Sequence, residues 1–294
     1  MDTEKCHALL ETLRIGNLTR AAQELGYTAS GISRMMASLE QEAGFPLLLR
    51  SRSGVRPTEE CRRLLPLIRE LDRLGDQYDQ ETAKIRGLDI GSLNAGTAYI
   101  NYYGPLSRII AEFSRRYPGI RVGLIEGRSS ELAGMVSDHE ADFCIITKRD
   151  GRFDWIPLLE DEMTVWVPHD HPRADQETYP LTDFEKDPFI EIYPNQITDN
   201  SIIFERLHIT PNTRYSVVAT FAAMKMIEAG LGVTMVNSLY VKERTSPLIR
   251  SLKPDPPIKV GVGIAVTKEN ELSPAARTFR EFAVEKLVHQ GIPD

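Results

Sequence analysis

The architecture of this chain follows from one stretch near its N-terminus, residues 21–58, which read AAQELGYTASGISRMMASLEQEAGFPLLLRSRSGVRPT. The first half predicts two short helices joined by a tight turn at Gly26, because glycine tolerates the positive φ that such a turn requires. Ala22 supplies the small side chain needed where two helices cross closely. Thr28 is suited to cap the second helix, residues 28–42. This pattern is typical of a helix-turn-helix, whose second helix enters the major groove of DNA.

The spacing of these helices also suits an ordinary helical hairpin, and the residues that follow favour DNA binding instead. Up to Thr58 they look like a two-stranded wing, and residues 30–58 contain four arginines against two glutamates. Arginines on a wing pair with phosphates or enter the minor groove, although a solvated surface loop is the alternative interpretation. The predicted DNA contacts are Thr28, Ala29, Ser30, Ser33, Arg34, Arg50, Arg52 and Arg56.

Composition and charge are compatible with this interpretation. Of the 294 residues, 41% are hydrophobic and 26% are charged, as in ordinary globular proteins of two or three compact units. The net charge of −7 arises entirely after residue 87, because residues 1–87 hold 13 basic and 13 acidic side chains. No apolar run approaches the roughly 20 residues that span a bilayer, and the N-terminus does not look like a signal peptide. Three cysteines, odd in number and far apart, favour a reduced, cytoplasmic protein with no membrane partner.

A long helix is predicted after the wing. Residues 57–60 read PTEE, which suits a helix start with Thr58 as the N-cap, and the helix should reach about residue 86 with a kink at Pro66. Its apolar residues have the three- and four-residue spacing of a helix that packs along another helix: Leu64, Leu67, Leu71, Leu74 and Tyr78. From residue 88, where a first strand is expected at 88–91, helices and strands alternate, which predicts an α/β sheet of parallel strands.

The quoted stretch resembles the winged helix-turn-helix of the LysR-type transcriptional regulators, and the resemblance extends along essentially the whole chain. Later landmarks of the family are FSRRYPGI at 113–120, then Glu126-Gly127, EADF at 140–143, HP at 171–172 and EAGLGV at 228–233. Ala29 departs from the family, which often has a Gln suited to reading adenine there, and this affects a base contact but not the fold. Further departures are Leu48-Leu49 for a Phe-bearing wing entry, Cys61 for Gly, and Ser238 where Pro is frequent.

The resemblance implies an α/β protein with an N-terminal winged helix-turn-helix, a long linker helix and a two-lobed effector domain like that of periplasmic binding proteins. The implied DNA-binding domain is 1–58, the linker or dimerisation helix is 59–87, and the effector-binding domain is 88–294. Lobe one would comprise 88–162 and 266–294, and lobe two 163–265, with chain crossings near 160–167 and 261–268. The effector would lie between the lobes, where strand ends and helix N-termini converge.

Polar residues at strand-to-helix turns are the candidates for effector contacts, although serine and threonine before a helix are often simple N-caps. The candidates are Ser92, Asn94, Thr97, Ser129, Ser130, Thr147 and Thr220. Three basic residues would favour an anionic effector unless they are merely solvated: Arg128, Lys148 and Arg149.

The function implied by the resemblance is sequence-specific, DNA-binding regulation of transcription, modulated by a small-molecule effector. The implied partners are a double-stranded inverted-repeat operator, the effector, further copies in a homodimer or homotetramer, and RNA polymerase. No enzyme activity, cofactor or metal is expected. The alternatives are a cytosolic solute-binding protein and an enzyme that uses the cleft, each without a DNA function.

Two sequence patterns bear on the enzyme and metal alternatives. Cys144 follows His139 by five residues, but a cysteine within an apolar strand is normally part of the core. His169 and His171 form an H-x-H pattern without a further His or Cys nearby, which indicates a surface loop.

Overall fold

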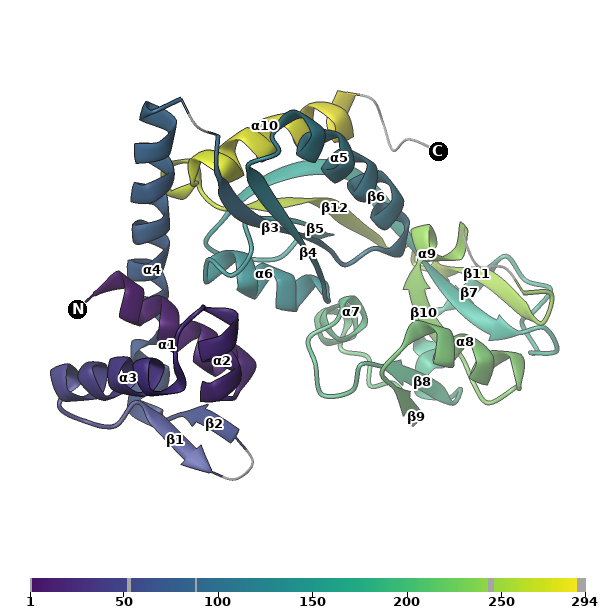
Figure 1. Ribbon diagram of the computed structural model, residues 1–294. Coiled ribbons are helices and arrows are strands. Elements are labelled where there is room, and N and C mark those ends of the chain that lie inside the picture. Colours follow the sequence, from purple (N-terminus) through teal and green to yellow (C-terminus); the bar gives the residue numbers. More distant parts are fainter. Residues whose placement is uncertain (1, 52–53, 88, 243–245, 290–294) are drawn as a thin grey trace. The chain divides into compact units, whose positions relative to one another are not determined.

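The computed structural model describes residues 2–51, 54–87, 89–242 and 246–289, which form two compact units. The N-terminal unit comprises the chain up to Gly91 with two short additions, Gly119–Arg121 and Ser273–Ala275. The C-terminal unit comprises the rest of the chain (Figure 1).

The N-terminal unit is a winged helix-turn-helix followed by a long helix, as the sequence predicts (Figure 1). Thr28 caps the second helix of the motif, because its side-chain oxygen accepts a hydrogen bond from the N–H of Gly31 at 3.0 Å. Gly26 in the preceding turn has a φ of 73°, and Ala22 is buried. The described elements are α1 Thr3–Ile15, α2 Leu18–Glu24, α3 Ala29–Ala43, β1 Leu48–Ser51, β2 Gly54–Pro57 and α4 Glu59–Ile85.

The wing is tied to the helices by hydrogen bonds at both ends. The strands β1 and β2 pair antiparallel. At the entry to β1, the Glu40 carboxylate on α3 accepts hydrogen bonds from the N–H groups of Leu47 and Leu48, at 2.9 and 3.1 Å. On the other strand, the N–H of Val55 donates to the carbonyl of Gly16 at 2.8 Å. These bonds fix the position of the wing relative to α3.

Helix α4 has one face in the core of the unit and a second, apolar face that is exposed. Thr58 caps the helix by accepting from the N–H of Cys61 at 3.1 Å, and Cys61 and Ile68 are buried. Pro66 lies within the helix. The exposed apolar stripe comprises Leu67, Leu71, Leu74 and Tyr78, followed by Ile85. Leu64, which was expected to share this face, is partly buried against the core instead.

Lobe one of the C-terminal unit is a sheet in the order β4-β3-β5-β12-β6. Helices α5 and α10 lie on one side of it and α6 on the other (Figure 1). Side chains of β5 alternate between the two sides: Phe143 packs on Phe279 of α10, whereas Cys144 and Ile146 pack with residues of α6. The bounds are β3 Gly91–Thr97, η1 Ile100–Tyr102, α5 Tyr103–Arg116, β4 Ile120–Glu126, α6 Ser129–Ser137, β5 Phe143–Thr147, β6 Asp154–Pro168, β12 Lys259–Val266, η3 Glu269–Glu271 and α10 Pro274–His289.

Lobe two is built on the second part of β6, which pairs with β10 and β11, while β7 pairs with β11. The strands β8 and β9 form a separate parallel pair. A cluster of aromatic rings fills the core: Tyr179, Phe184, Phe189 and Phe204. The bounds are β7 Thr178–Pro180, η2 Leu181–Glu185, β8 Phe189–Ile192, α7 Asp199–Leu207, β9 Thr213–Val217, α8 Thr220–Glu228, β10 Thr234–Asn237, α9 Ser238–Lys242 and β11 Ile249–Asp255.

The strand β6 carries the chain from lobe one into lobe two. Glu162 pairs with Lys259 of β12, whereas the next residue, Met163, pairs with Asn237 of β10. This crossing falls within the predicted 160–167. The chain returns between β11 and β12, earlier than the predicted 261–268, because β12 pairs along its length with lobe-one strands. Residues 261–265, which the sequence places in lobe two, therefore pair in lobe one.

Two expectations about the sheet are wrong. The strands are not all parallel, because β12 runs antiparallel to both β5 and β6. The first strand begins at Gly91 rather than occupying 88–91, and its buried face is formed by Leu93, Ala95 and Thr97. The strand β9 is not predicted by the sequence because four of its five residues are exposed, so it lacks an apolar pattern.

Candidate functional sites: an exposed helix end and an interlobe cleft

The N-terminal end of α3 faces outward, whereas the residues of the same helix that face the core are apolar. Arg34 lies along the exposed surface, where its Nε donates to the carbonyl oxygen of Ser30 at 3.3 Å. The predicted contact residues Thr28, Ala29, Ser30 and Arg34 are exposed, and Ser33 is half-buried. The core-facing residues are Ile32, Met36 and Leu39. Hydroxyl and guanidinium groups are thus grouped at the helix end that reads bases in helix-turn-helix proteins.

Arginines of the wing flank this helix end. Arg50 on β1 approaches α3, with its guanidinium 3.5 Å from the hydroxyl of Ser33 and 3.8 Å from the carboxylate of Glu40. Arg56 on β2 is exposed. Arg52 lies outside the described residues. The structure therefore groups Arg50 with the α3 residues predicted from the sequence, and it leaves Arg56 open to solvent.

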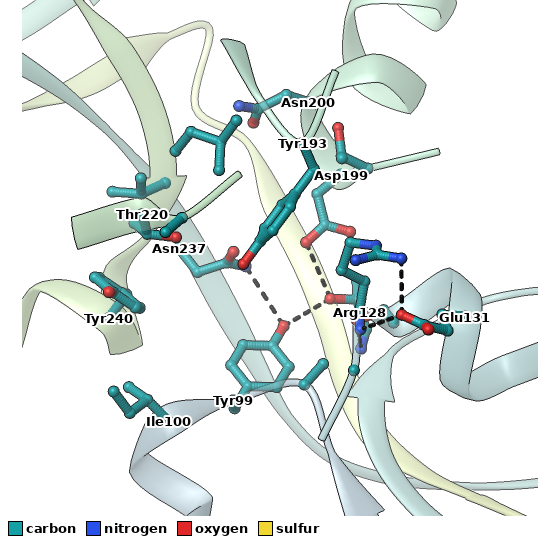
Figure 2. A pocket seen from close by; sticks show the side chains of 18 of the residues that line it. Tyr99, Ile100, Arg128, Glu131, Tyr193, Asp199, Asn200, Thr220, Asn237 and Tyr240 are labelled. Carbon is teal, nitrogen blue, oxygen red and sulfur yellow. Dashed lines mark hydrogen bonds and ion pairs between the residues drawn. The ribbon is translucent and has the colours of Figure 1, made fainter. Parts of the chain in front are cut away.

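A cleft of about 560 Å³ lies within the C-terminal unit, between its two lobes (Figure 2). Lobe one contributes the turns after β3, β4 and β5, and lobe two contributes the starts of α7 and α8 and the end of β10. The volume is within the range of sites that hold small organic molecules. The principal polar and aromatic lining residues are Tyr99, Tyr103, Glu126, Arg128, Ser129, Glu131, Thr147, Arg149, Tyr193, Asp199, Thr220, Asn237 and Tyr240.

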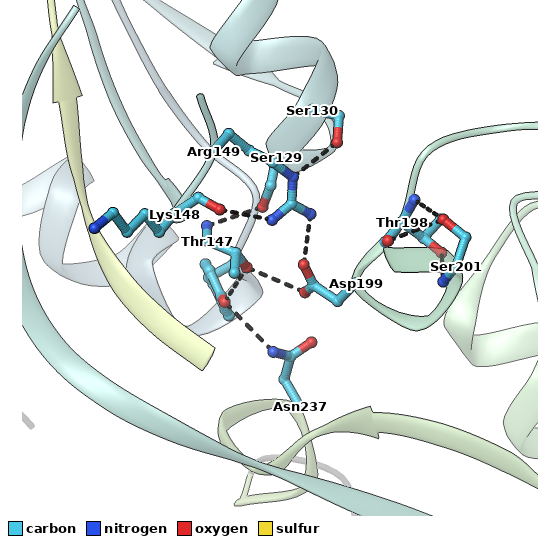
Figure 3. Close-up of polar contacts among 10 residues, drawn as sticks. Ser129, Ser130, Thr147, Lys148, Arg149, Thr198, Asp199, Ser201 and Asn237 are labelled. Carbon is cyan, nitrogen blue, oxygen red and sulfur yellow. Dashed lines mark hydrogen bonds and ion pairs between the residues drawn. The ribbon is translucent and has the colours of Figure 1, made fainter. Parts of the chain in front are cut away.

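A chain of polar contacts crosses this cleft (Figure 3). From lobe one, the hydroxyls of Tyr99 and Thr147 lie 2.7 Å apart, and the Thr147 hydroxyl donates to the carboxylate of Asp199 in lobe two at 3.1 Å. The guanidinium of Arg149 donates to the other oxygen of Asp199 at 2.5 Å. Asn237 of lobe two donates to the Tyr99 hydroxyl at 3.4 Å. Burial, with the nearby Asp199 carboxylate, raises the pKa of Tyr99, so its phenol stays protonated.

The start of α6 supports this chain from the lobe-one side. The hydroxyl oxygen of Ser129 accepts from the N–H of Thr147 at 3.0 Å, and that of Ser130 accepts from Nε of Arg149 at 2.9 Å. These bonds fix Thr147 and the Arg149 guanidinium at the end of β5. Arg128, just before α6, pairs with Glu131 at 2.8 Å and lies over the Tyr193 ring at 5.2 Å from its centroid.

The structure brings together some of the predicted effector residues and separates others. Ser129, Thr147 and Thr220 line the cleft. Ser130 does not line it but holds Arg149. The remaining three, Ser92, Asn94 and Thr97, lie on β3 itself, because the strand begins later than expected. Asn94 is bonded to the Asp142 carboxylate and the Glu140 carbonyl, and Thr97 is buried with its hydroxyl bonded to the backbone of Tyr99.

On the lobe-two side of the cleft, sequence reasoning found Thr220 and missed the other lining residues. Asp199 opens α7, a helix that the apolar pattern does not predict, and Tyr193 has a positive φ in the loop after β8. One signal was available: residues 198–201 read TDNS, a sequence suited to start a helix with Thr198 as its cap. The side chain of Tyr99 had no comparable sequence signal.

Cys144 and His171 are each held within the fold. Cys144 is buried in β5, and burial raises its pKa to about 12. His171 is bonded to the Asp187 carboxylate at 3.2 Å. Within residues 2–51, 54–87, 89–242 and 246–289, no cluster of three His, Cys, Asp or Glu side chains is placed to hold a metal ion. No helix in the described part of the chain is both long and apolar enough to cross a membrane.

We expect the thiols of the folded protein to be unreactive. Cys6, Cys61 and Cys144 are buried, and burial raises all three pKa values, that of Cys61 to about 11. Because the thiolate is the reactive form, a disulfide reagent at about pH 8 should label none of them within minutes. The unfolded protein in guanidinium chloride is the control, and all three thiols should react there. A single rapidly labelled thiol in the native protein would contradict this expectation.

Two family patterns match the chain. The bacterial regulatory helix-turn-helix pattern of the lysR family matches residues 3–62, and the LysR substrate binding domain matches residues 86–288. An uncharacterised HTH-type transcriptional regulator of Bacillus subtilis, YvbU, is 27% identical over 92% of this chain and 93% of its own.

Solved structures show the same fold. Full-length OxyR C199D of Pseudomonas aeruginosa aligns with a TM-score of 0.73 at 18% identity, covering 99% of this chain and 96% of its own. Full-length CbnR complexed with its target DNA aligns with a TM-score of 0.58 at 19% identity, covering 96% of this chain and 99% of its own. Since the two family patterns together cover most of the sequence, the chain belongs to the LysR family of DNA-binding transcriptional regulators with an effector-binding domain.

Proposed function

We propose that this regulator reads its operator with the N-terminal end of α3 and holds the DNA backbone with the wing. The observation that carries the proposal is the exposure of Ser30 and Arg34, with the half-buried Ser33 between them, on a helix capped by Thr28. These groups can donate to base edges in the major groove, whereas Arg50 and Arg56 are placed on the adjoining wing to meet phosphates. Ala29 lies among them and offers only an apolar contact, such as one to a thymine methyl group.

We assign the domains close to the bounds expected from the sequence: DNA binding by residues 1–58, a linker helix at 59–87 and effector binding by 88–294. The family matches at 3–62 and 86–288, and the bounds of α4, support these assignments. Lobe two is proposed to end before β12, because that strand pairs in lobe one.

The effector is proposed to bind in the interlobe cleft. Thr147, Ser129 and Thr220 are retained from the sequence prediction, and Tyr99, Arg149 and Asp199 are added because they line the same cleft. A ligand that contacts both lobes binds one lobe arrangement better than another, and this difference is what allows it to change DNA binding. We assign no catalytic role to the cleft, because the chain belongs to a family of transcriptional regulators.

The exposed stripe of α4 is proposed to pair with the same helix of a second copy. Two reading heads would then face an inverted-repeat operator, in a homodimer or a homotetramer. RNA polymerase at the promoter is proposed as a further partner. The proposed compartment is the cytoplasm, which holds the operator DNA in a bacterium.

Fluorescence anisotropy with DNA from upstream of the protein's own gene tests the reading surface. Arg34→Ala should cost about 1–3 kcal/mol of binding free energy and relax base preference, because a base contact is lost. Arg56→Ala should lower the affinity for all DNA sequences alike and reduce the salt dependence of binding by about one released counterion. Arg206→Ala, at an exposed position in lobe two, is the matched control. Equal affinities for all three variants and the unaltered protein would remove these residues from the interface.

A further inference from the structure

Opposite charges from the two lobes meet inside the cleft. Arg149 extends from the end of β5 in lobe one, and Asp199 is the first residue of α7 in lobe two (Figure 3). Their side chains are joined at 2.5 Å and are only 12% and 16% exposed. Removing one partner from a charge pair this well shielded from water costs free energy, because the other charge is left buried and unpaired.

Neutral polar side chains surround the pair. Nε of Arg149 donates to the Ser130 hydroxyl, and the hydroxyls of Ser129 and Thr147 line the same lobe-one wall, where they can donate to an anionic group. The Asp199 carboxylate accepts from the Thr147 hydroxyl, and Tyr99 and Asn237 follow along the same chain of contacts, where each can present an oxygen to a cationic group. The cleft thus offers hydrogen-bond donors for an anionic group and acceptors for a cationic group within one hydrogen-bonded chain.

The charge pair restricts the class of ligand that can enter. An anion bound to Arg149 would leave the Asp199 carboxylate unpaired and shielded from water. A cation bound to Asp199 would leave the Arg149 guanidinium unpaired in the same way. A ligand that carries both charges a few ångströms apart replaces one ion pair by two. We propose that the effector is an α-amino acid, with its carboxylate on Arg149 and its ammonium group on Asp199. This inference rests on the cleft's being the effector site.

The rest of the cleft favours an apolar or aromatic side chain on that amino acid. Ile100, Tyr103 and Tyr240 line the cleft together with Ile197 and Phe221, and the last two are at least half-exposed. The other cation of the lining, Arg128, is already paired with Glu131 and lies over an aromatic ring. A side-chain carboxylate on the ligand would therefore find no available cation among the described lining residues.

Calorimetric titration of the full-length protein with the twenty standard amino acids, each up to millimolar concentration, is the first test. The best apolar or aromatic amino acid is then compared with two analogues, one lacking the carboxylate and one lacking the amino group; for L-phenylalanine these are 2-phenylethylamine and 3-phenylpropanoate. The amino acid should bind about 30-fold or more tighter than either analogue, since each leaves one charge unpaired. Absence of binding by every amino acid, or equal binding by the acid analogue, overturns the proposal.

Two variants separate a role in recognition from a role in folding. Asp199→Asn keeps the shape of the side chain and should abolish the preference for the amino acid over its deaminated analogue, while the analogue still binds. Arg149→Ala should remove binding of both compounds. Arg152→Ala, an exposed cation of the same lobe outside the cleft, should leave both affinities unchanged. An unchanged preference in Asp199→Asn contradicts the assigned contact.

The failure of this inference is distinguishable from failure of the regulator assignment. If neutral or singly charged metabolites bind in the cleft and amino acids do not, only the proposed ligand class is wrong. If the unaltered protein fails to shift its own upstream DNA, the regulator function fails whatever binds in the cleft.

Discussion

Replacing Leu74 by glutamate on α4 is expected to separate the protein into monomers and to weaken operator binding by about 100-fold or more. Leu74 is 47% exposed and lies one turn from Leu71 and Tyr78, in an apolar stripe that no described part of the chain covers. A charge in the centre of a helix–helix seam is strongly unfavourable, and two linked reading heads bind far more tightly than one. Sedimentation velocity gives the oligomeric state, and anisotropy gives the DNA affinity.

Lys84→Glu is the control for this variant. Lys84 is an exposed position of the same helix, outside the apolar stripe, so the oligomer and the DNA affinity should be close to those of the unaltered protein. A Leu74→Glu protein that remains oligomeric with unchanged DNA affinity would show that subunits associate through another surface.

Phe279→Ala is expected to cost about 3–5 kcal/mol of the free energy of unfolding of the C-terminal unit. The ring is fully buried and makes edge-to-face contacts with Phe113 and Phe143, so its removal opens a cavity between α5, α10 and the lobe-one sheet. Guanidinium denaturation followed by tryptophan fluorescence measures this directly. Both tryptophans, Trp155 and Trp166, belong to the C-terminal unit, so the signal reports on that unit.

Val288→Ala on the same helix provides the comparison. Its side chain is 46% exposed, and the free energy of unfolding should fall by no more than about 0.5 kcal/mol. Equal shifts of the midpoint in the two variants would mean that the aromatic cluster is not the core of lobe one.

The N-terminal unit could be predicted nearly completely from the sequence. Its signals are local: Gly26 marks the turn, Thr28 and Thr58 cap helices, and the apolar stripe of α4 has a regular spacing. The C-terminal sheet is less predictable, because strand pairing depends on residues far apart in the chain. The position of β12 between β5 and β6 is an example, since its apolar sequence is compatible with either lobe.

The lobe-one side of the cleft was more predictable than the lobe-two side, where only Thr220 was found. Ser129 and Thr147 belong to lobe-one elements with clear apolar patterns, and both line the cleft. Asp199 lies on a helix with a weak apolar pattern. Its pairing with Arg149, fifty residues earlier in the chain, depends on how the two lobes come together. The displaced start of β3 moved Ser92 and Asn94 out of the predicted site, because a shift in the start of a strand changes which residues follow it.

Selection of bound duplexes from a random DNA pool tests most directly whether the N-terminal end of α3 reads base sequence. The unaltered protein should select two inverted half-sites. Arg34→Ala should lose base preference at one position of each half-site, and Ala29→Gln should gain a preference for adenine at another, because glutamine can bond both N6 and N7 of adenine. Selection of the same sequence by all three proteins, or of no sequence by the unaltered protein, would contradict a base-reading role for α3.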